Sequence, residues 1–127
     1  MSSFTPKLQD VAIKTIAMPK DTNPSGDIFG GWIVSQMDLA GALVAQKYVK
    51  KRVTTVAIHE MSFHKPVHVG DEVTCFGRVE KVGNTSVTIH VEVWVNSPIS
   101  EKNHKVTEGT FVFVALDKEG RPTPIHS

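Results

Sequence analysis

The chain has 127 residues, enough for one domain that buries about two thirds of its unfolded surface and too few for two ordinary cores. Its 14 basic and 13 acidic residues give a formal net charge of +1, and no run of like charges is longer than Lys50-Lys51-Arg52. This balance excludes a strong field that would recruit nucleic acid or a membrane surface. We therefore expect a single domain over residues 1–127 that holds any anionic ligand through local contacts.

The cysteine content and the N-terminus bear on the compartment. Cys75 is the one cysteine of the chain, which excludes an internal disulfide framework and fits a reducing environment. Residues 1–10 contain no apolar segment typical of a signal peptide, and no stretch approaches the roughly 18 apolar residues of a membrane span. We expect a soluble, cytoplasmic protein.

The first part of the chain predicts one strand and one long helix. Residues 11–17 are typical of a strand, and residues 19–26 form a turn-rich connection. From about Phe29 to Tyr48, apolar residues recur at helical spacing, with the small residues Gly41 and Ala42 suited to close packing. The spaced positions are Ile33, Met37, Ala40, Val44 and Tyr48.

The remainder of the chain predicts a run of strands. Residues 52–63 and 72–82 are rich in strand formers, and "VGNTS" at 82–86 predicts a hairpin turn. Residues 86–96 alternate strictly, with valine or isoleucine at 87, 89, 91, 93 and 95 on one face and Thr88, His90, Glu92 and Trp94 on the other. "TFVFVAL" at 110–116 is apolar on both faces, as in a central strand, and a tail that we expect to be flexible follows from about residue 118.

These elements predict an α+β fold with a curved antiparallel sheet wrapped around one long central helix. A helix that is apolar over most of its circumference cannot be covered by one side of a small flat sheet. We expect subunit association to cover further apolar positions, including Trp94 and the aromatic residues of the last strand.

Several chemistries are not indicated. None of the six histidines forms an H-x3-H pair on a recognisable helix, and Pro66 separates His64 from His68, so we expect no metal site. Cys75 alternates with apolar neighbours and is expected to be a small core residue. The sequence contains no G-x-S-x-G motif, and "GDIFGG" has neither the lysine of a P-loop nor the G-x-G-x-x-G order of a dinucleotide site.

One residue of the predicted helix is unusual. Asp38 lies among apolar neighbours. Burying an unpaired carboxylate there would cost roughly several kcal/mol of desolvation free energy, or would shift the pKa of the carboxyl. It therefore needs a hydrogen-bonding partner or a chemical task. From the residues alone, an aspartate paired with a buried donor at a subunit interface and a catalytic aspartate are equally good interpretations.

Four segments point to a family. "IAMPKDTNPSGDIFGGWIVSQMD", "VTTVAIHEMSFHKPVHVGDEV", "GRVEKVGNTSVTIHVEVWV" and "FVFVALD" closely resemble the YciA-type bacterial acyl-CoA thioesterases of the hotdog fold. The likeness covers roughly residues 11–118 and includes the spacing of Asn23, Gly30 and Asp38 with a double glycine. It implies a dimer with a continuous sheet, often assembled as a homohexameric trimer of dimers. Such a protein hydrolyses acyl-CoA to free acid and coenzyme A without a cofactor, with broad tolerance for short to medium chains.

The resemblance implies that Asp38 acts as general base or nucleophile. It also implies that Asn23 orients the water or holds the thioester end of the substrate, and that the N–H of Gly30, beside Gly31, polarises the thioester carbonyl. Gly30 and Gly31 lie where the helix begins, so their N–H groups suit a developing oxyanion. Asp38 follows eight residues later, about 12 Å along the axis, too far to reach the same carbonyl carbon. Antiparallel helices across a twofold axis would bring Asp38 of one chain near Asn23 and Gly30 of the other, so the dimer would be the catalytic unit.

Two further sets of residues are candidates for substrate binding. Thr55, with the small helix residues, is expected to line the acyl channel. The basic turn offers donors and cations for the coenzyme A phosphates, although an ordinary hairpin would have the same composition. Its candidates are Arg78, Lys81, Gly83, Asn84, Thr85 and Ser86.

Two alternative functions remain open. Hotdog dehydratases as a class rely on a histidine, and here neither the helix nor the loop before it contains one, which favours hydrolysis. A non-catalytic acyl-CoA-binding module would tolerate the loss of Asp38, because fold alone does not fix function.

Overall fold

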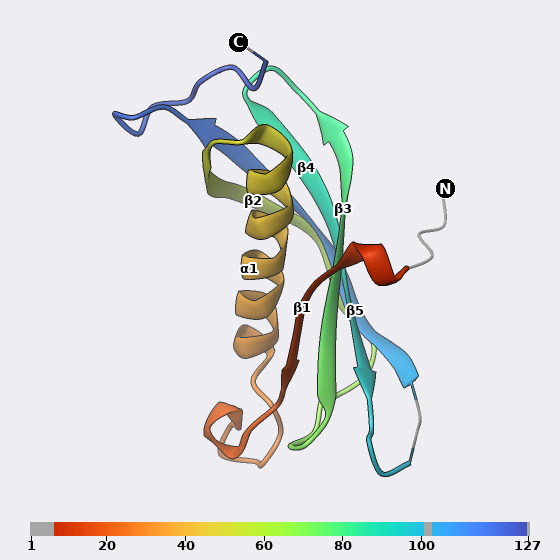
Figure 1. Ribbon diagram of the computed structural model, residues 1–127. Coiled ribbons are helices and arrows are strands. Elements are labelled where there is room, and N and C mark those ends of the chain that lie inside the picture. Colours follow the sequence, from red (N-terminus) through yellow and green to blue (C-terminus); the bar gives the residue numbers. More distant parts are fainter. Residues whose placement is uncertain (1–6, 101–102, 127) are drawn as a thin grey trace.

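One helix packs against one face of a five-stranded antiparallel sheet (Figure 1). The structure is a computed structural model that describes residues 7–100 and 103–126. The sheet has the strand order β1-β3-β4-β5-β2 and curls along one side of α1. This arrangement confirms the predicted α+β class. The elements in chain order are η1 (Leu8–Asp10), β1 (Val11–Ile16), η2 (Pro19–Asp21), α1 (Gly30–Val49), β2 (Arg52–Phe63), β3 (Glu72–Val82), β4 (Ser86–Asn96) and β5 (Asn103–Leu116).

The last strand is longer than its apolar pattern predicts. β5 begins at Asn103 and not at residue 110, and it lies between β4 and the edge strand β2. Residues 103–109 include Lys105, Glu108 and Gly109, so no apolar alternation marks them. They are strand because they pair in register with β4, from Asn96 opposite Asn103 onward. Pairing across the sheet decides this boundary, and a single-strand pattern does not contain that information.

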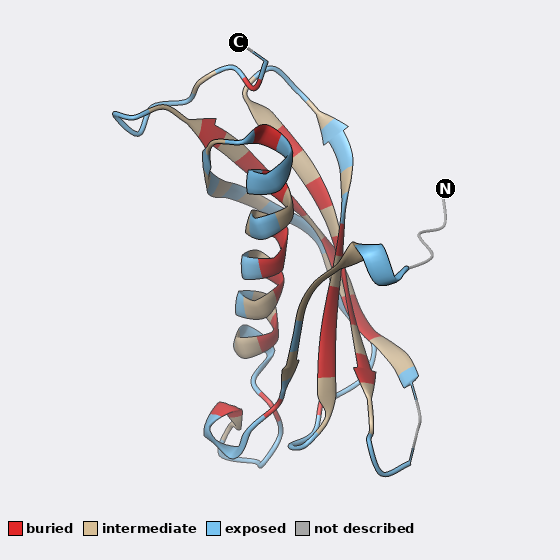
Figure 2. Cartoon of the chain, viewed as in Figure 1, coloured by how far each residue is buried: buried red, intermediate tan, exposed pale blue. Residues whose placement is uncertain are grey.

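The core lies between α1 and the sheet face that it covers, where Figure 2 shows the buried residues. The five apolar alternating positions of β4 are all buried, as predicted. Phe111 and Phe113 of β5 are also fully buried, whereas Trp94 lies on the opposite face and is half-buried. The expectation that a partner covers the aromatic residues of the last strand is therefore wrong for these two phenylalanines.

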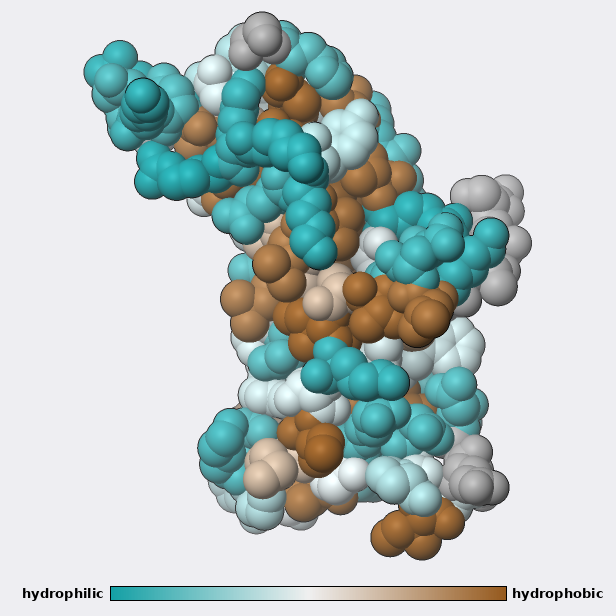
Figure 3. Space-filling model, viewed as in Figure 1, coloured by the Kyte–Doolittle hydropathy of each residue, from teal (hydrophilic) through white to brown (hydrophobic). Residues whose placement is uncertain are grey.

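The sheet covers one side of α1. The buried helix residues are Ile33, Met37, Ala40, Gly41, Ala45 and Val49. Tyr48, predicted on the buried face, is 46% exposed, and Val49 takes the inward position. Leu39 and Leu43 remain 57% and 40% exposed, and Figure 3 shows hydrophobic side chains gathered over the middle of the helix. A surface of this kind on a folded chain indicates a partner.

Glycines allow the helix to approach the sheet closely. A Cβ on Gly41 would lie 3.0 Å from the Phe113 ring, and a Cβ on Gly77 of β3 would lie 2.8 Å from Val44 Cγ2. Real Cβ atoms hardly tolerate such contacts, so the helix could not lie this close to the sheet with larger residues. The predicted close packing at Gly41 is confirmed.

Hydrogen bonds hold the segment after β5, which was expected to be a flexible tail. The N–H of Thr123 donates to Ala115 O at 2.9 Å, and the N–H of Ile125 donates to Asn84 O at 2.9 Å. Lys51 Nζ donates to Pro124 O at 2.6 Å, and the Ile125 side chain is buried. This segment therefore packs on the β3–β4 turn and the end of α1.

Among the described residues, no helix combines the length and apolar character needed to cross a bilayer.

The C-terminus of α1 provides a stability prediction. Lys50 ends the helix at φ 60° and ψ 31°, and its N–H donates to Gln46 O at 2.8 Å. A side chain in this left-handed conformation costs about 1–2 kcal/mol that glycine avoids. We expect Lys50→Gly to raise the free energy of unfolding by about 0.5–1 kcal/mol in urea titrations. Lys47→Gly, inside the helix, should lower it by about 1 kcal/mol. Equal losses in both variants would contradict this account.

Candidate active site

The carboxylate of Asp38 has a hydrogen-bonding partner within the chain. Thr55 Oγ1, on β2, donates a hydrogen bond of 2.6 Å to Asp38 Oδ1, on α1. Asp38 is half-buried between helix and sheet. Thr55 was expected to line the acyl channel, and the structure places its hydroxyl against the candidate catalytic acid. The signal in the sequence was a threonine at an inward position of a strand, between Val53 and Ala57, but its partner could not be identified there.

The first turn of α1 leaves backbone donors available. Phe29, the residue before the helix, forms no side-chain cap, and its carbonyl accepts from the N–H groups of Trp32 and Ile33. In the part of the chain that the structure describes, the N–H groups of Gly30 and Gly31 have no hydrogen-bonding partner. Both glycines are exposed, and a Cβ on Gly31 would meet open space. Two free donors at the positive end of a helix dipole favour an anion or a polarised carbonyl oxygen.

Asn23 organises the loop that precedes this turn. Its side-chain Oδ1 accepts from the N–H groups of Ser25 and Asp27 at 2.9 Å and 3.0 Å. Its backbone closes the same turn through Asp27 O and Gly26 N, and Gly26 has a φ of 87° that suits glycine. The turn interpretation of Asn23 is therefore correct. It leaves the Nδ2 amide hydrogens to donate to a ligand.

One chain does not gather these groups around one reacting atom. Asp38 lies eight helical residues after Gly30, about 12 Å along the axis. A cavity of about 560 Å³ lies on the sheet face away from α1; it is lined by Lys14, Phe76 and Trp94 among others, and Asp38 is not part of it.

Exposed apolar side chains lie near Asp38. Leu39 and Leu43 are exposed on α1, and Val56 and Ile58 are 55% and 43% exposed on the edge strand β2. The surface around Asp38 is therefore open on the side where the sheet ends.

The candidate coenzyme A residues lie at the other end of the molecule. The turn between β3 and β4 is near the C-terminal end of α1 (Figure 1), and the helix is about 30 Å long. The chain therefore does not bring Lys81, Gly83, Asn84, Thr85 and Ser86 close to its own Gly30. Arg78 forms an ion pair of 3.1 Å with Asp10. The N–H of Gly83 donates to Ser86 O, and Asn84 O and Thr85 O accept from the C-terminal segment and β5.

Cys75 is a core residue, as predicted. It is fully buried on β3, and burial raises the pKa of its thiol from 9.0 to about 12. Because the thiolate is the reactive form, Cys75 is not a nucleophile at neutral pH.

The Cys75 thiol should not react in the folded protein. We expect less than a tenth of one thiol per chain to react with a disulfide reagent at pH 8, and one per chain after unfolding in guanidinium. The unfolded thiol ionises near pH 9.0 and the folded one near 12, so this contribution to stability is complete below pH 9.0 and is lost progressively toward pH 12. Rapid labelling of the folded chain at pH 8 would contradict this burial.

Sequence comparisons identify the family. A sequence profile of the thioesterase superfamily matches residues 25–101, more than half of the chain. The chain belongs to the thioesterase superfamily. The acyl-CoA thioester hydrolase YciA of Escherichia coli (strain K12) is 49% identical over 116 residues, which are 89% of this chain and 88% of that protein. The segment matched by the superfamily profile, residues 25–101, includes the start of α1 and the β3–β4 turn.

Solved structures agree with this membership. HI0827, described as a hexameric broad specificity acyl-coenzyme A thioesterase, superposes with a TM-score of 0.87 at 48% identity, covering 92% of this chain and 81% of that chain. Cj0915 of Campylobacter jejuni, a hexameric hotdog fold thioesterase, gives a TM-score of 0.85 at 39% identity, covering 91% and 89%. The fold of this superfamily member is the hotdog fold, as the resemblance implied.

Proposed function

We propose that this protein is an acyl-CoA thioester hydrolase with broad specificity for short to medium acyl chains. The observation that carries the proposal is the hydrogen bond from Thr55 of β2 to Asp38 of α1, a helix whose first N–H groups, at Gly30 and Gly31, have no partner in the described residues. Relatives at 48–49% identity over about nine tenths of the chain are an acyl-CoA thioester hydrolase and an acyl-coenzyme A thioesterase. The chemistry needs no cofactor, because coenzyme A is part of substrate and product.

In the proposed reaction the thioester carbonyl accepts hydrogen bonds from the helix N-terminus. Asp38 either removes a proton from the attacking water or attacks the carbonyl carbon itself, giving a mixed anhydride that water then opens. In both routes a C–O bond forms, the C–S bond breaks, and the coenzyme A thiolate leaves and takes up a proton. The N–H groups of Gly30 and Gly31 stabilise the negative charge that develops on the carbonyl oxygen. Asn23 Nδ2 donates to the water or to the thioester end of the substrate.

Two chains are proposed to form each site. The roughly 12 Å between Gly30 and Asp38 is too long for one carbonyl group, but antiparallel helices across a twofold axis would place Asp38 of one chain by Gly30 of the other. The open edge of β2 and the exposed side chains of Leu39, Leu43, Val56 and Ile58 support contact on this side. HI0827 and Cj0915 are hexamers, so we propose that three such dimers assemble here.

The β3–β4 turn is proposed to bind the coenzyme A phosphates of a site whose catalytic groups lie in another chain. Backbone N–H groups near Gly83, hydroxyls and nearby cations suit a pyrophosphate. The residues proposed are Arg78, Lys81, Gly83, Asn84, Thr85 and Ser86.

We also propose a cytoplasmic location, which the lone free Cys75 thiol supports.

The direct test is release of free thiol from acyl-CoA thioesters of increasing chain length, with acid formation followed by mass spectrometry. We expect one carboxylic acid and one coenzyme A per thioester, for several chain lengths. Tight binding of acyl-CoA without thiol release would establish the non-catalytic module instead. Hydration of an enoyl-CoA without C–S cleavage would establish the dehydratase.

Thr55 is expected to position the Asp38 carboxylate. A hydrogen bond to a charged group contributes about 1.5–3 kcal/mol, so Thr55→Val should lower kcat roughly 10–100-fold. KM should change little, because the Thr55 hydroxyl donates its one hydrogen to Asp38 and has none left to donate to the substrate. Thr55→Ser keeps the donor and should recover most of the rate in steady-state assays. Equal losses in the valine and serine variants would show that packing, not the hydrogen bond, is what Thr55 provides.

A further inference from the structure

Three metal-ligating side chains converge on the sheet face away from α1. His90 Nε2, on β4, lies 3.1 Å from Glu92 Oε2 of the same strand and 3.5 Å from Glu108 Oε1 of β5. The three ligand atoms lie within 4.8 Å of one another. Glu92 is 3% exposed, and His90 and Glu108 are partly buried. The proposed thioesterase chemistry uses none of these residues.

The strand register places two carboxylates directly opposite each other. Glu92 pairs with Glu108 in the β4–β5 ladder, and His90 lies two residues from Glu92 on the same face. Like charges at such positions are destabilising, and burial of Glu92 increases the cost. Lys105, whose Nζ lies 2.9 Å from Glu108 Oε2, offsets part of this repulsion from one side, and a positive group between the two carboxylates would offset more of it.

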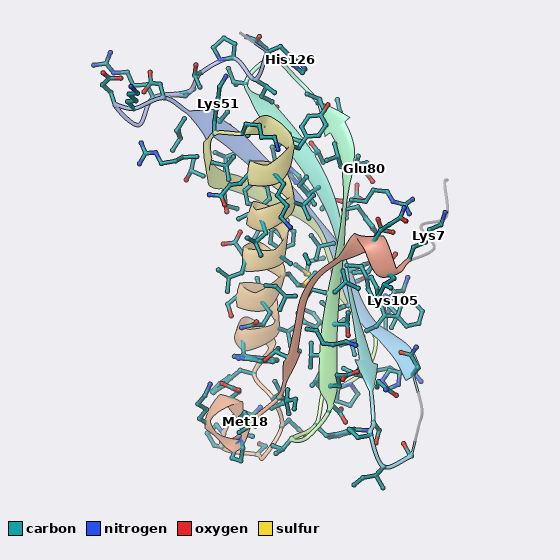
Figure 4. All side chains as sticks on the ribbon, in the orientation of Figure 1. Lys7, Met18, Lys51, Glu80, Lys105 and His126 are labelled. Carbon is teal, nitrogen blue, oxygen red and sulfur yellow. The ribbon has the colours of Figure 1, made fainter. Side chains whose placement is uncertain are left out.

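A second layer of donors fixes which oxygens face His90. Trp94 Nε1–H donates to Glu92 Oε1 at 2.9 Å, and Lys105 Nζ donates to Glu108 Oε2 at 2.9 Å. Figure 4 shows Lys105 on the side of the sheet away from α1. The hydrogen bond from Lys105 also lowers the pKa of the Glu108 carboxyl. Each carboxylate therefore has one oxygen held from outside and one turned toward the imidazole, as in the outer shells of metal sites.

We propose that His90, Glu92 and Glu108 bind one divalent transition-metal ion, of which Zn²⁺ is the best fit. Tetrahedral zinc with bonds of about 2.0–2.1 Å places neighbouring ligand atoms about 3.3 Å apart, close to the separations from His90 Nε2. One imidazole and two carboxylates suit zinc better than magnesium or calcium, which prefer oxygen ligands alone. The ion would bind between the opposed carboxylates, with water as the fourth ligand. Its binding requires His90 Nε2 to be unprotonated, so a proton there is released to solvent.

This site differs from the sequence-based expectation of no metal, which considered histidine spacing along single segments. Here the ligands come from two strands that the register brings together. The competing occupant is a proton, since a protonated His90 would also neutralise the two carboxylates.

Zinc titration of tag-free, metal-stripped protein tests the proposal. Calorimetry with Zn²⁺ should give about one ion per chain, and Co²⁺ should give visible absorption bands typical of tetrahedral nitrogen and oxygen ligands. His90→Gln and Glu92→Gln should each weaken Zn²⁺ binding at least tenfold. Trp94→Phe removes the donor to Glu92 and should weaken it about tenfold.

Matched controls are His68→Gln and Glu80→Gln, exposed residues outside the cluster (Figure 4 labels Glu80, distant from Lys105). Both should bind Zn²⁺ as wild type does. Circular dichroism and oligomer size establish that each variant folds. If Glu92→Gln does not fold, Trp94→Phe still tests the site. Absence of stoichiometric binding in wild type, or equal binding in wild type and the His90 and Trp94 variants, would overturn the proposal and favour the protonated imidazole.

Discussion

Asp38→Asn should abolish most thioester hydrolysis while leaving the protein folded and able to bind coenzyme A. Removing a general base or nucleophile costs about 10²–10⁴-fold in kcat. Asparagine has the size of aspartate, and its Oδ1 still accepts the hydrogen bond from Thr55 that the structure shows at 2.6 Å. The helix and its packing are therefore retained. Thiol release from a panel of acyl-CoA thioesters, with calorimetric binding of coenzyme A, measures both effects.

Asp27→Asn is the matched control for this variant. Asp27 is an exposed carboxylate just before α1, and no hydrogen bond involves its side chain in the described residues. We expect its kcat to equal that of wild type. If Asp38→Asn also hydrolyses at the wild-type rate, then Asp38 stabilises the contact between α1 and β2 and has no chemical role.

Mixed dimers test whether two chains form each site. In a dimer of one Asp38→Asn chain and one Asn23→Ala chain, a shared site would have one intact copy and one doubly defective copy. Co-expression of the two inactive variants with different tags, followed by tandem purification, should therefore restore up to about half of the activity of wild type. A mixed dimer as inactive as its parents would place both residues in the site of the same chain.

The sequence predicted best those elements whose pattern is local. The apolar positions of β4 recur with the period of a strand, and α1 repeats with the period of a helix, so their bounds followed from the residues. The turn at Asn23 followed from its Asn, Pro and Gly composition. These features depend on neighbours within a few residues.

The features that the sequence could not predict depend on distant pairings. Residues 103–109 join β5 only because they pair with β4, and the same register brings Glu108 to Glu92. Thr55 is 17 positions from Asp38 along the chain and meets it only when β2 packs beside α1. Tyr48 fits the helical repeat, but it is exposed because the next residue, Val49, takes the buried position at this end of the helix. Each difference comes from which surfaces meet, which no single segment specifies.

Phe113→Ala should cause the largest loss of stability, about 3–5 kcal/mol, because it empties a fully buried ring position between β5 and α1. Urea titrations at one fixed protein concentration measure this, since the stability of an oligomer depends on concentration. Phe113→Leu keeps an apolar side chain but lacks the ring atoms that face the helix. The free energy of unfolding should fall less than half as much in Phe113→Leu as in Phe113→Ala.

The same ring explains why the helix has glycine at position 41. An added Cβ at Gly41 would lie 3.0 Å from Phe113 Cε2 and Cζ, so Gly41→Ala should cost about 1–3 kcal/mol in wild type. In the Phe113→Leu background those atoms are absent, and the better helix propensity of alanine, about 1 kcal/mol, should offset most of the cost. The double-mutant cycle should therefore give a coupling of about 1–2 kcal/mol. Equal penalties in both backgrounds would mean that contacts other than the Phe113 ring set the distance between α1 and the sheet. A coupling of the expected size would mean that this one aromatic contact sets how closely the helix bearing Asp38 packs against the strand bearing Phe113, whose neighbour β2 holds Thr55.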